Sequence, residues 1–187
     1  MGKTLKIAFF NFTQNTVERG CEVFISELSR RLKTNNQVTI FSDKNKLIKR
    51  LPILWRFYID LQGIQILLFT LDHFKDVLKE KYDIVVPLNN GWQPVILRFL
   101  TLLYGGKMVI SGQSGRGWDD RNNLLIFPDA FVSISSALKS WAKKVNPFVK
   151  VRYIPNGVDL NKFKQDGSKI NTGLERPIIL CVGASFF

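Results

Sequence analysis

Short apolar runs alternate along the chain with segments in which apolar residues recur at helical spacing. A continuous apolar run, typical of a strand buried on both faces, is found at 5–10, and further apolar-rich strand patterns are found at 38–42, 82–88, 107–111, 130–135 and 149–155. Amphipathic helices are predicted at 21–33, 94–105 and 136–145. Strands that alternate with helices in this way predict an α/β fold with a Rossmann-like, doubly wound parallel sheet.

The region after residue 155 predicts the end of one domain and the start of another. It is polar and rich in turn residues, and a further buried-strand pattern follows it. A strand of this kind needs neighbouring strands to pair its backbone groups. We therefore expect a Rossmann-like domain at 1–160, a linker at 161–176 and, at 177–187, the first strand of a second domain in a longer polypeptide.

Composition restricts the class of protein and its partners. Of the 187 residues, 45% are hydrophobic and 22% are charged, as in folded globular domains. The net charge of +12 favours an anionic partner, which can be a nucleic acid, an acidic lipid surface or a phosphorylated ligand. The two cysteines, Cys21 and Cys181, are too few for a disulfide framework or a zinc cluster. Without a secretory signal or a membrane-spanning run, we expect a cytoplasmic location, and peripheral attachment to the inner face of a membrane stays open.

The loops that follow the strands carry the candidate chemistry, because parallel sheets bind ligands at the carboxyl ends of their strands. The first such loop, 11–20, ends where a helix is predicted to start, with Gly20 and Glu22. A glycine there lets a phosphate approach the backbone N–H groups. The alternative is that Gly20 shapes the turn and Glu22 complements the helix dipole.

A glycine-rich loop at 112–120 combines a flexible backbone with arginine, tryptophan and paired carboxylates. Trp and Asp together are typical of sugar recognition, by stacking and by hydrogen bonds to hydroxyl groups. The alternative is a plain connector in which Asp119 or Asp120 caps the following helix. With the loop at 89–92, this pattern nominates candidates for binding a sugar or an acceptor. They are Asn90, Trp92, Gln113, Arg116, Trp118 and Asp119.

The segment at 44–81 separates two predicted strands and is basic, aromatic and amphipathic, which suits an anionic membrane surface. The candidate membrane contacts are Lys46, Lys49, Arg50, Trp55 and Arg56. The alternative is a core-packing helix whose basic side chains lie in water. Nucleic-acid binding is a third interpretation, but no helix-turn-helix, RNP or OB pattern accompanies the charge. His73, the sole histidine, suits a structural or surface role better than catalysis, and the sequence nominates no metal ligands.

The motif that narrows the function follows the last predicted strand of the first domain. Ile154-Pro155-Asn156-Gly157-Val158-Asp159, with Phe163 shortly after it, resembles the interdomain junction of family 4 glycosyltransferases. Gly20 and Glu22 before a Leu-rich helix are similar to that family's first glycine-rich loop. The segments 131–135 and 176–183 also resemble the family, so the resemblance covers essentially the whole chain.

The resemblance implies a retaining glycosyltransferase with the GT-B architecture, in which two Rossmann-like domains face each other across a cleft. This chain would supply the acceptor-binding half, and a nucleotide-sugar donor would bind mainly to a C-terminal domain. Catalysis would need neither a metal nor another cofactor. We therefore expect a hexosyl-type transferase that is part of a longer protein and is inactive as the isolated chain.

By matching position, the resemblance places Gly20 and Glu22 near the donor phosphates and the loop at 112–113 near the reacting sugar. It also implies an interdomain hinge, formed by Asn156, Gly157 and Asp159. Gln113 stands where many members of the family have a histidine. Because an amide cannot transfer a proton, no catalytic residue is assigned.

Two interpretations stand beside a transferase of cell-envelope or lipid-linked glycan synthesis. A non-catalytic module that binds a membrane or a glycan would keep the same fold. A basic nucleic-acid-binding protein rests on the charge alone and is disfavoured. The expected partners are thus a nucleotide-sugar donor, a glycan or lipid-linked acceptor and an anionic membrane surface.

Overall fold

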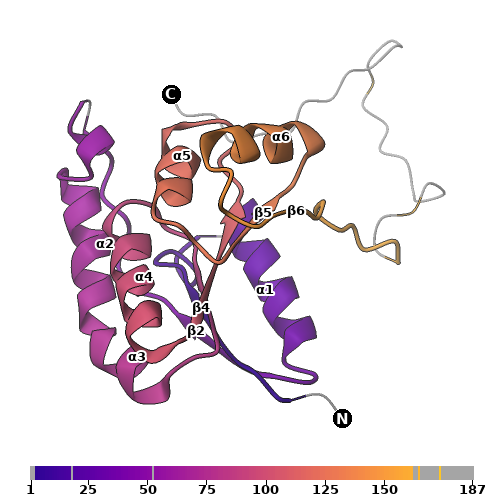
Figure 1. The fold of residues 1–187 in the computed structure, drawn as a ribbon, viewed down its shortest axis with the longest axis horizontal. Helices are drawn as coiled ribbons and strands as arrows, with labels where there is room; N and C mark the ends of the chain where they lie inside the picture. Colours follow the sequence, from indigo (N-terminus) through magenta and orange to yellow (C-terminus); the bar gives the residue numbers. More distant parts are fainter. Residues whose placement is uncertain (1–2, 18, 52, 162–163, 165–172, 174–187) are drawn as a thin grey trace. The chain divides into compact units, whose positions relative to one another are not determined.

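The computed structural model describes residues 3–17, 19–51, 53–161, 164 and 173 (Figure 1). The chain divides into two compact units, Met1–Pro155 and Asn156–Phe187. All helices and strands of the described residues belong to the first unit. The strand predicted at 177–187 lies outside the described residues, as does Phe163.

Six strands form one sheet in which every neighbouring pair is parallel, and their order across the sheet is β2-β1-β3-β4-β5-β6. The strands are β1 Lys6–Phe10, β2 Gln37–Phe41, β3 Ile84–Pro87, β4 Lys107–Gly112, β5 Ala130–Ser133 and β6 Val151–Tyr153. Each strand overlaps one of the apolar runs of the sequence. The predicted α/β class with a Rossmann-like parallel sheet is therefore confirmed.

Helices connect the strands. They are α1 Gly20–Leu32, α2 Leu61–Asp72, α3 Phe74–Glu80, α4 Trp92–Tyr104, α5 Trp118–Leu125 and α6 Ser136–Val145, with a short 3₁₀ turn, η1 Leu54–Phe57. α1, α4 and α6 correspond to the three predicted helices, while η1, α2 and α3 occupy the 44–81 segment. Side-chain caps fix two of the starts. Ser135 Oγ accepts a hydrogen bond from Leu138 N at α6 over 3.1 Å, and Asp60 Oδ1 accepts one from Gly63 N at α2 over 3.0 Å.

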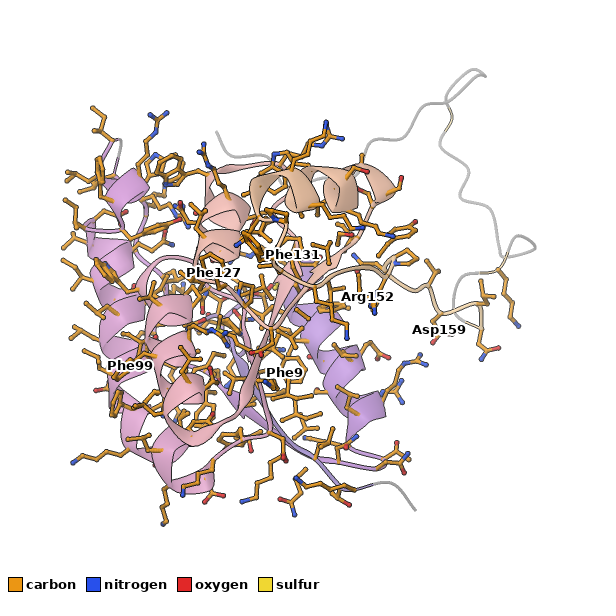
Figure 2. The ribbon with its side chains drawn as sticks, in the orientation of Figure 1. Phe9, Phe99, Phe127, Phe131, Arg152 and Asp159 are labelled. Carbon is orange, nitrogen blue, oxygen red and sulfur yellow. The ribbon has the colours of Figure 1, made fainter. Side chains whose placement is uncertain are left out.

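Alternate residues of each strand point to opposite faces of the sheet. On one face, Phe9 of β1, which Figure 2 labels, lies in a core cluster with Ile7 of the same strand and Ile25 of α1. On the other face, Ala8 and Phe10 belong to a core that contains buried residues from all the helices α2 to α6. α1 therefore covers one face and the remaining helices cover the other, which is the doubly wound arrangement.

The side on which the helices run changes between β1 and β3. These two strands are neighbours, yet β1 is followed by α1 on one face and β3 is followed by α4 on the other. Loops that leave adjacent strands toward opposite faces open a crevice at the carboxyl ends, where open α/β sheets bind ligands. The predicted site loops at 11–20 and 89–92 flank this crevice.

α2 and α4 lie side by side, and their solvent-facing positions are apolar (Figure 1). We define the α2–α4 face as Leu61, Ile64, Leu68 and Leu71 of α2 with Trp92, Val95, Phe99, Leu102 and Leu103 of α4. These side chains are between 41% and 64% exposed. Among the described residues, no helix combines the length and the hydrophobicity that crossing a membrane requires.

Candidate functional site at the carboxyl edge of the sheet

Glu22, in the first turn of α1, is a buried carboxylate next to the loop that follows β1. Thr13, in the loop after β1, donates a hydrogen bond to Glu22 Oε1 over 2.5 Å, and Asn11 Nδ2 donates to the same oxygen over 3.5 Å. All three side chains are buried. Glu22 Oε2, in contrast, has no hydrogen-bond partner among the described residues. This oxygen has almost no exposed surface, so it is a buried acceptor that is left unsatisfied.

The N-terminus of α1 next to Glu22 is open. Arg19 occupies the N-cap position and makes no side-chain capping hydrogen bond. A Cβ placed on Gly20 would meet no described atom within 4 Å, so the backbone there is accessible. Uncapped N–H groups at a helix N-terminus attract anions. This geometry fits the predicted phosphate site, and it also fits the alternative in which Glu22 complements the helix dipole.

Asn89 and Gln93 join the loops after β1 and β3 at the crevice. Asn89 Oδ1 accepts hydrogen bonds from Phe12 N over 2.8 Å and from Gln93 Nε2 over 3.3 Å. Gln93 Oε1 accepts one from Asn89 N over 3.0 Å, and Gln93 is fully buried. These bonds join the loop after β1 to the loop after β3 and to the first turn of α4. No role was assigned to Gln93 from the sequence. A glutamine at the start of an otherwise apolar helix could have indicated a buried amide with hydrogen-bond partners nearby.

In the loop after β4, a hydrogen bond holds the Gln113 side chain, and the Arg116 side chain is exposed. Gln113 Nε2 donates a hydrogen bond to Ser111 Oγ over 2.9 Å. Gly115 adopts φ +82°, in the left-handed region that favours glycine. The Arg116 guanidinium forms no hydrogen bond or ion pair within the described part of the chain. Of the two candidates in this loop, Arg116 is the one whose polar group can meet an anionic ligand.

Asp120 is a second buried carboxylate at this edge. It is 1% exposed, and its Oδ2 has no hydrogen-bond partner among the described residues. Gly112 at the end of β4 lies against it, because a Cβ placed on Gly112 would lie 3.3 Å from that oxygen and would overlap the Phe131 ring. The close approach of the β4 backbone to Asp120 therefore requires glycine at this position.

The protonation of Asp120 responds to its surroundings. Burial, and after it the Asp119 carboxylate, raise the pKa of Asp120 to about 7. Hydrogen bonds from Asn123 and from the N–H groups of Gly115 and Ser114 oppose this rise. A carboxyl group that changes charge near neutral pH at the ligand-binding edge is a candidate functional group. The sequence placed Asp120 among the paired carboxylates of the 112–120 loop, with a helix cap as the alternative, and did not nominate it as a contact residue.

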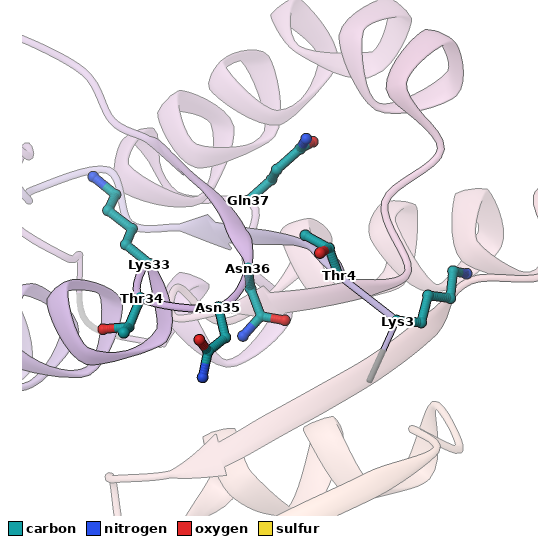
Figure 3. A pocket seen from close by; sticks show the side chains of 7 residues that line it. All are labelled: Lys3, Thr4, Lys33, Thr34, Asn35, Asn36 and Gln37. Carbon is teal, nitrogen blue, oxygen red and sulfur yellow. The ribbon is translucent and has the colours of Figure 1, made fainter. Parts of the chain in front are cut away.

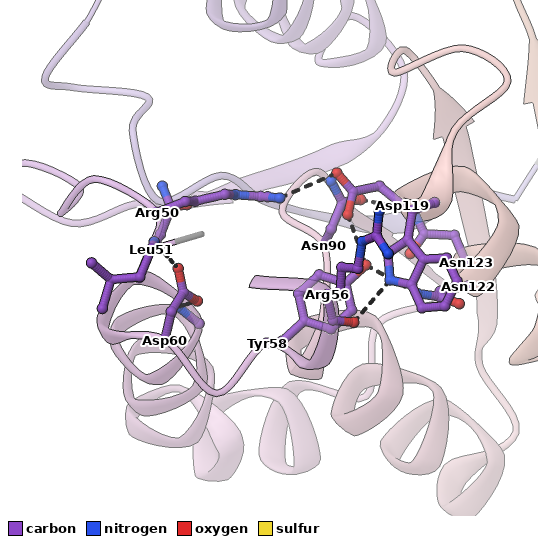
Figure 4. A network of polar contacts seen from close by, with 12 residues as sticks. Arg50, Leu51, Arg56, Tyr58, Asp60, Asn90, Asp119, Asn122 and Asn123 are labelled. Atoms are coloured by element: carbon purple, nitrogen blue, oxygen red, sulfur yellow. Dashed lines mark hydrogen bonds and ion pairs between the residues drawn. The ribbon is translucent and has the colours of Figure 1, made fainter. Parts of the chain in front are cut away.

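Asp119 lies in a polar cluster with Tyr58 and Arg50 (Figure 4). The Tyr58 hydroxyl donates a hydrogen bond to Asp119 Oδ1 over 2.7 Å and accepts one from Asn122 Nδ2 over 3.2 Å. Arg50 lies 3.5 Å from Asp119 Oδ2 in an ion pair. The cluster brings together a predicted sugar contact and a predicted membrane contact, which the sequence placed in separate sites.

The two candidate tryptophans also bond to the segment around η1. Trp92 Nε1 donates a hydrogen bond to Tyr58 O over 3.1 Å, and Trp118 Nε1 donates one to Arg56 O over 2.8 Å. Both indole rings stay partly exposed, at 42% for Trp92 and 41% for Trp118. Their N–H groups are therefore occupied within the protein, while their ring faces can still stack on a ligand.

Asn90 is bonded within the fold and borders an apolar pocket. Its Oδ1 accepts a hydrogen bond from Asn123 Nδ2 over 2.8 Å. The pocket next to it, which we call the Trp92 pocket, has a volume of about 330 Å³. It is lined by Arg56, Phe57, Tyr58, Gly91, Trp92, Pro94, Val95, Asn122, Asn123, Leu125 and Ile126. This lining, apolar with a few amides, suits a ligand with a hydrophobic portion.

The remaining predicted residues lie apart from this cluster or in the second unit. Lys46 and Lys49 are exposed. The guanidinium carbon of Arg50 lies over the Trp55 ring, 5.5 Å from the ring centroid. The predicted hinge residues Asn156, Gly157 and Asp159 are exposed in the second unit, where Asp159 Oδ1 accepts a hydrogen bond from Asn161 N over 2.9 Å. Cys181 and the 176–183 segment lie outside the described residues.

No cluster of three or more His, Cys, Asp or Glu side chains suited to a metal ion occurs within the described ranges. His73 packs against aromatic rings, with centroid distances of 4.8 Å to Phe41 and 5.1 Å to Phe69. The His73 ring is therefore part of an aromatic cluster.

A larger hollow lies at the opposite, amino edge of the sheet (Figure 3). It measures about 690 Å³ and is lined by Lys3, Thr4, Lys33, Thr34, Asn35, Asn36 and Gln37. These residues precede β1 or lie before and at the start of β2, whereas open α/β sheets bind ligands beyond the carboxyl ends of their strands. We therefore place the candidate site at the carboxyl edge.

No protein-family model matches this sequence, and a search of curated proteins finds no match. The function therefore has to be argued from the residues and the fold.

Proposed function

We propose that this chain is the acceptor-binding half of a retaining, nucleotide-sugar-dependent glycosyltransferase of the family 4, GT-B type. The observation that carries the proposal is the position of the Ile154–Asp159 sequence. It follows directly on β6, the last strand of the parallel sheet, and the first compact unit ends within it, at Pro155. A domain junction at this point is what the resemblance implies.

Two features of the carboxyl edge support a sugar-phosphate ligand. The open N-terminus of α1 at Gly20 offers backbone N–H groups to the donor phosphates. Glu22 lies beside it and is buried, and its Oε1 accepts hydrogen bonds from Thr13 and Asn11, which hold the loop after β1 against α1. Arg116 adds an unpaired positive charge in the loop after β4. No residue is assigned to catalysis, and no metal or other cofactor is invoked.

The acceptor is proposed to lie toward the Trp92 pocket. The pocket is largely apolar and carries Asn122 and Asn123 at its wall. Trp92 lines it, and both Trp92 and Trp118 are partly exposed and bond to the segment around η1. Apolar and stacking surfaces together suit a lipid-linked or cell-envelope glycan as the acceptor class.

A charge substitution at Gly20 tests the proposal. Gly20→Asp places a carboxylate in the first turn of α1 without a steric clash, and it should leave the helix stable or stabilise it by about 0.3–1 kcal/mol. The same carboxylate repels phosphate. Gly157→Asp is the matched control, because it adds the same charge at a glycine that is equally open.

The measurement is a protein-detected NMR titration with a panel of nucleoside diphosphate sugars. We expect salt-sensitive shifts at Gly20 to Glu22 and in the loop after β4, lost in Gly20→Asp and kept in Gly157→Asp. If no nucleotide sugar shifts these loops, or if both variants bind equally, the proposed donor-facing role of this edge is wrong.

A non-catalytic module that binds a membrane or a glycan is the second candidate. The observation that favours it is the α2–α4 face, which exposes apolar side chains on two adjacent helices. The two candidates differ in the titration above, since only the transferase requires nucleotide-sugar binding.

A further inference from the structure

The α2–α4 face exposes apolar side chains that the core of the first unit does not explain. On a surface helix, apolar residues normally form one stripe toward the core and the solvent side is polar. Here the solvent side is apolar as well. Every exposed residue of α4 is apolar, and so is every exposed residue of α2 before Asp72. A contiguous apolar surface of this kind marks a contact with something outside the folded unit.

Basic side chains lie along the N-terminal half of α2. The chain from Lys44 to Ile59 carries no Asp or Glu. Its basic residues are Lys44, Lys46, Lys49, Arg50 and Arg56. Hydrogen bonds hold this segment on α2, because Gln65 bonds to Lys46 O over 3.1 Å and Gln62 accepts from Arg50 Nε over 2.7 Å. The positive charge therefore flanks the apolar face in space, not only in the sequence.

Acidic side chains are scarce around the same face. α4 contains none, Asp60 is buried as the cap of α2, and Asp72 comes at the last residue of α2. Arg50 is ion-paired with Asp119, but Lys44, Lys46 and Lys49 form no ion pair with a described residue. An apolar surface flanked by such cations is complementary to a bilayer with anionic headgroups. A second copy of this chain would instead present the same net charge of +12.

We propose that the α2–α4 face binds the surface of a bilayer that contains anionic lipids. The apolar side chains enter the boundary between headgroups and acyl chains, and Lys46 and Lys49 lie at the headgroup phosphates. α2 and α4 have 12 and 13 residues. A helix needs about 20 residues to cross a bilayer, so these two lie in the membrane plane.

This placement assigns the membrane contact to two helices rather than to the basic segment alone. It also brings the Trp92 pocket to the lipid surface, because Trp92 and Val95 belong both to the pocket and to the face. The contact does not depend on the proposed transferase activity, and its test uses no sugar donor or acceptor.

Co-sedimentation of the chain with vesicles tests the proposal. The vesicles contain phosphatidylcholine alone or phosphatidylcholine mixed with phosphatidylglycerol, at low and at high salt. We expect stronger binding to the mixed vesicles and weaker binding at high salt. Leu68→Gln/Phe99→Gln should bind about tenfold more weakly, since each substitution removes an exposed apolar side chain from the face.

Matched variants separate the face from general hydrophobicity and charge. Val23→Gln/Phe148→Gln removes exposed apolar side chains elsewhere and should bind like the unmodified chain. Lys46→Gln/Lys49→Gln should lose affinity for mixed vesicles, whereas Lys143→Gln/Lys144→Gln on α6, with the same change in net charge, should lose less. With brominated lipid, tryptophan quenching should drop in Trp92→Phe and persist in Trp141→Phe.

Two results would overturn the proposal. One is equal vesicle binding, or equal lack of binding, by the unmodified chain and Leu68→Gln/Phe99→Gln. The other is a dimer in sedimentation velocity that the same double variant dissociates, because a second copy would then cover the face. Circular dichroism and thermal melting of each variant establish that the exposed substitutions leave the fold intact.

Discussion

The hydroxyl group of Tyr58 donates a hydrogen bond to Asp119 Oδ1 over 2.7 Å, although the two residues are 61 positions apart in the sequence. Asn122 donates to the same hydroxyl over 3.2 Å. The contact joins the segment around η1 to α5, two regions that the sequence assigned to different partners. A sugar that bonds to Asp119 would therefore have to share this carboxylate with Tyr58 or displace the hydroxyl.

Removing that hydroxyl should weaken the fold. Tyr58→Phe deletes a donor to a partly buried carboxylate, and we expect a loss of about 1–2 kcal/mol in the free energy of unfolding, measured by urea denaturation. Tyr104→Phe is the matched control. The Tyr104 hydroxyl is buried without a partner among the described residues, so its removal should be neutral or stabilising. Equal losses in both variants would contradict this account.

Gly91 should tolerate a methyl group less well than Gly105. Both glycines have positive φ, +82° and +81°, so alanine is strained at either site. Gly105 lies in the left-handed region, where this strain is about 1–2 kcal/mol, whereas Gly91, with ψ −126°, lies outside that region and is more strained. Only at Gly91 would the Cβ also lie 2.7 Å from the Tyr58 ring, whereas at Gly105 it meets no described atom within 4 Å. Gly91→Ala should therefore cost about 1–3 kcal/mol more than Gly105→Ala. Thermal melting of the two variants measures the difference, and equal melting temperatures would rule out the Tyr58 contact.

Asp120 should make the chain less stable as the pH rises. Its pKa is raised from about 4 in the unfolded chain to about 7 in the fold, so between these values the native state binds more protons than the unfolded state. Its contribution to stability is complete below about pH 4 and is lost as the pH rises through about 7.

The comparison that isolates this effect is Asp120→Asn, which cannot ionise. We expect the free energy of unfolding of the variant, minus that of the unmodified chain, to increase from about pH 5 to about pH 8. The lower pH lies between the unfolded and native pKa values of Asp120, and the higher pH lies above both. Denaturation in urea at both pH values provides the numbers. A difference that stays constant with pH would mean that Asp120 is ionised throughout this range.

Asp129 should make the chain less stable as the pH falls, over a more acidic range than the one in which Asp120 acts. Burial alone would raise the pKa of Asp129, but hydrogen bonds from Met108 N, Lys107 and Arg98 lower it below its ordinary value. Its stabilisation is therefore present above the unfolded pKa of about 3.9 and is lost as the pH falls through the lowered native pKa. Asp129→Asn should cost about 1.5–3 kcal/mol at pH 7 and much less in acid, as measured by thermal melting across the pH range. A cost independent of pH would contradict this assignment.

The sheet could be predicted from the sequence because each strand lies within a short apolar-rich stretch that turn residues or helical patterns separate from the next. Helices α1, α4 and α6 could be predicted because their apolar residues recur at helical spacing. α2 was not delimited, because its Leu and Ile residues occupy the solvent side as well as the core side and leave no clear period. α4 also begins at Trp92, earlier than predicted, because Asn90 and Gly91 suggested a longer loop.

The candidate site was predicted in part. Loop positions follow from strand ends, so the places of Gly20, Gln113 and Arg116 at the carboxyl edge could be anticipated. The contacts of Tyr58 could not, because they depend on where two segments distant in sequence meet. The functional roles of these residues remain predictions until ligand binding is measured.

The segment from Ile53 to Asp60 differs from the sheet in how firmly it is held. Ile53 and Tyr58 have positive φ without being glycine, and the side chains of Ile53 and Phe57 are 74% and 63% exposed. Its attachment depends on a few hydrogen bonds that close a long loop. Such segments open locally at a small fraction of the free energy that global unfolding requires. Backbone amides here should exchange with deuterium well before those of β1 or β3, and each opening would release Trp92 and Asp119 for contact with a ligand.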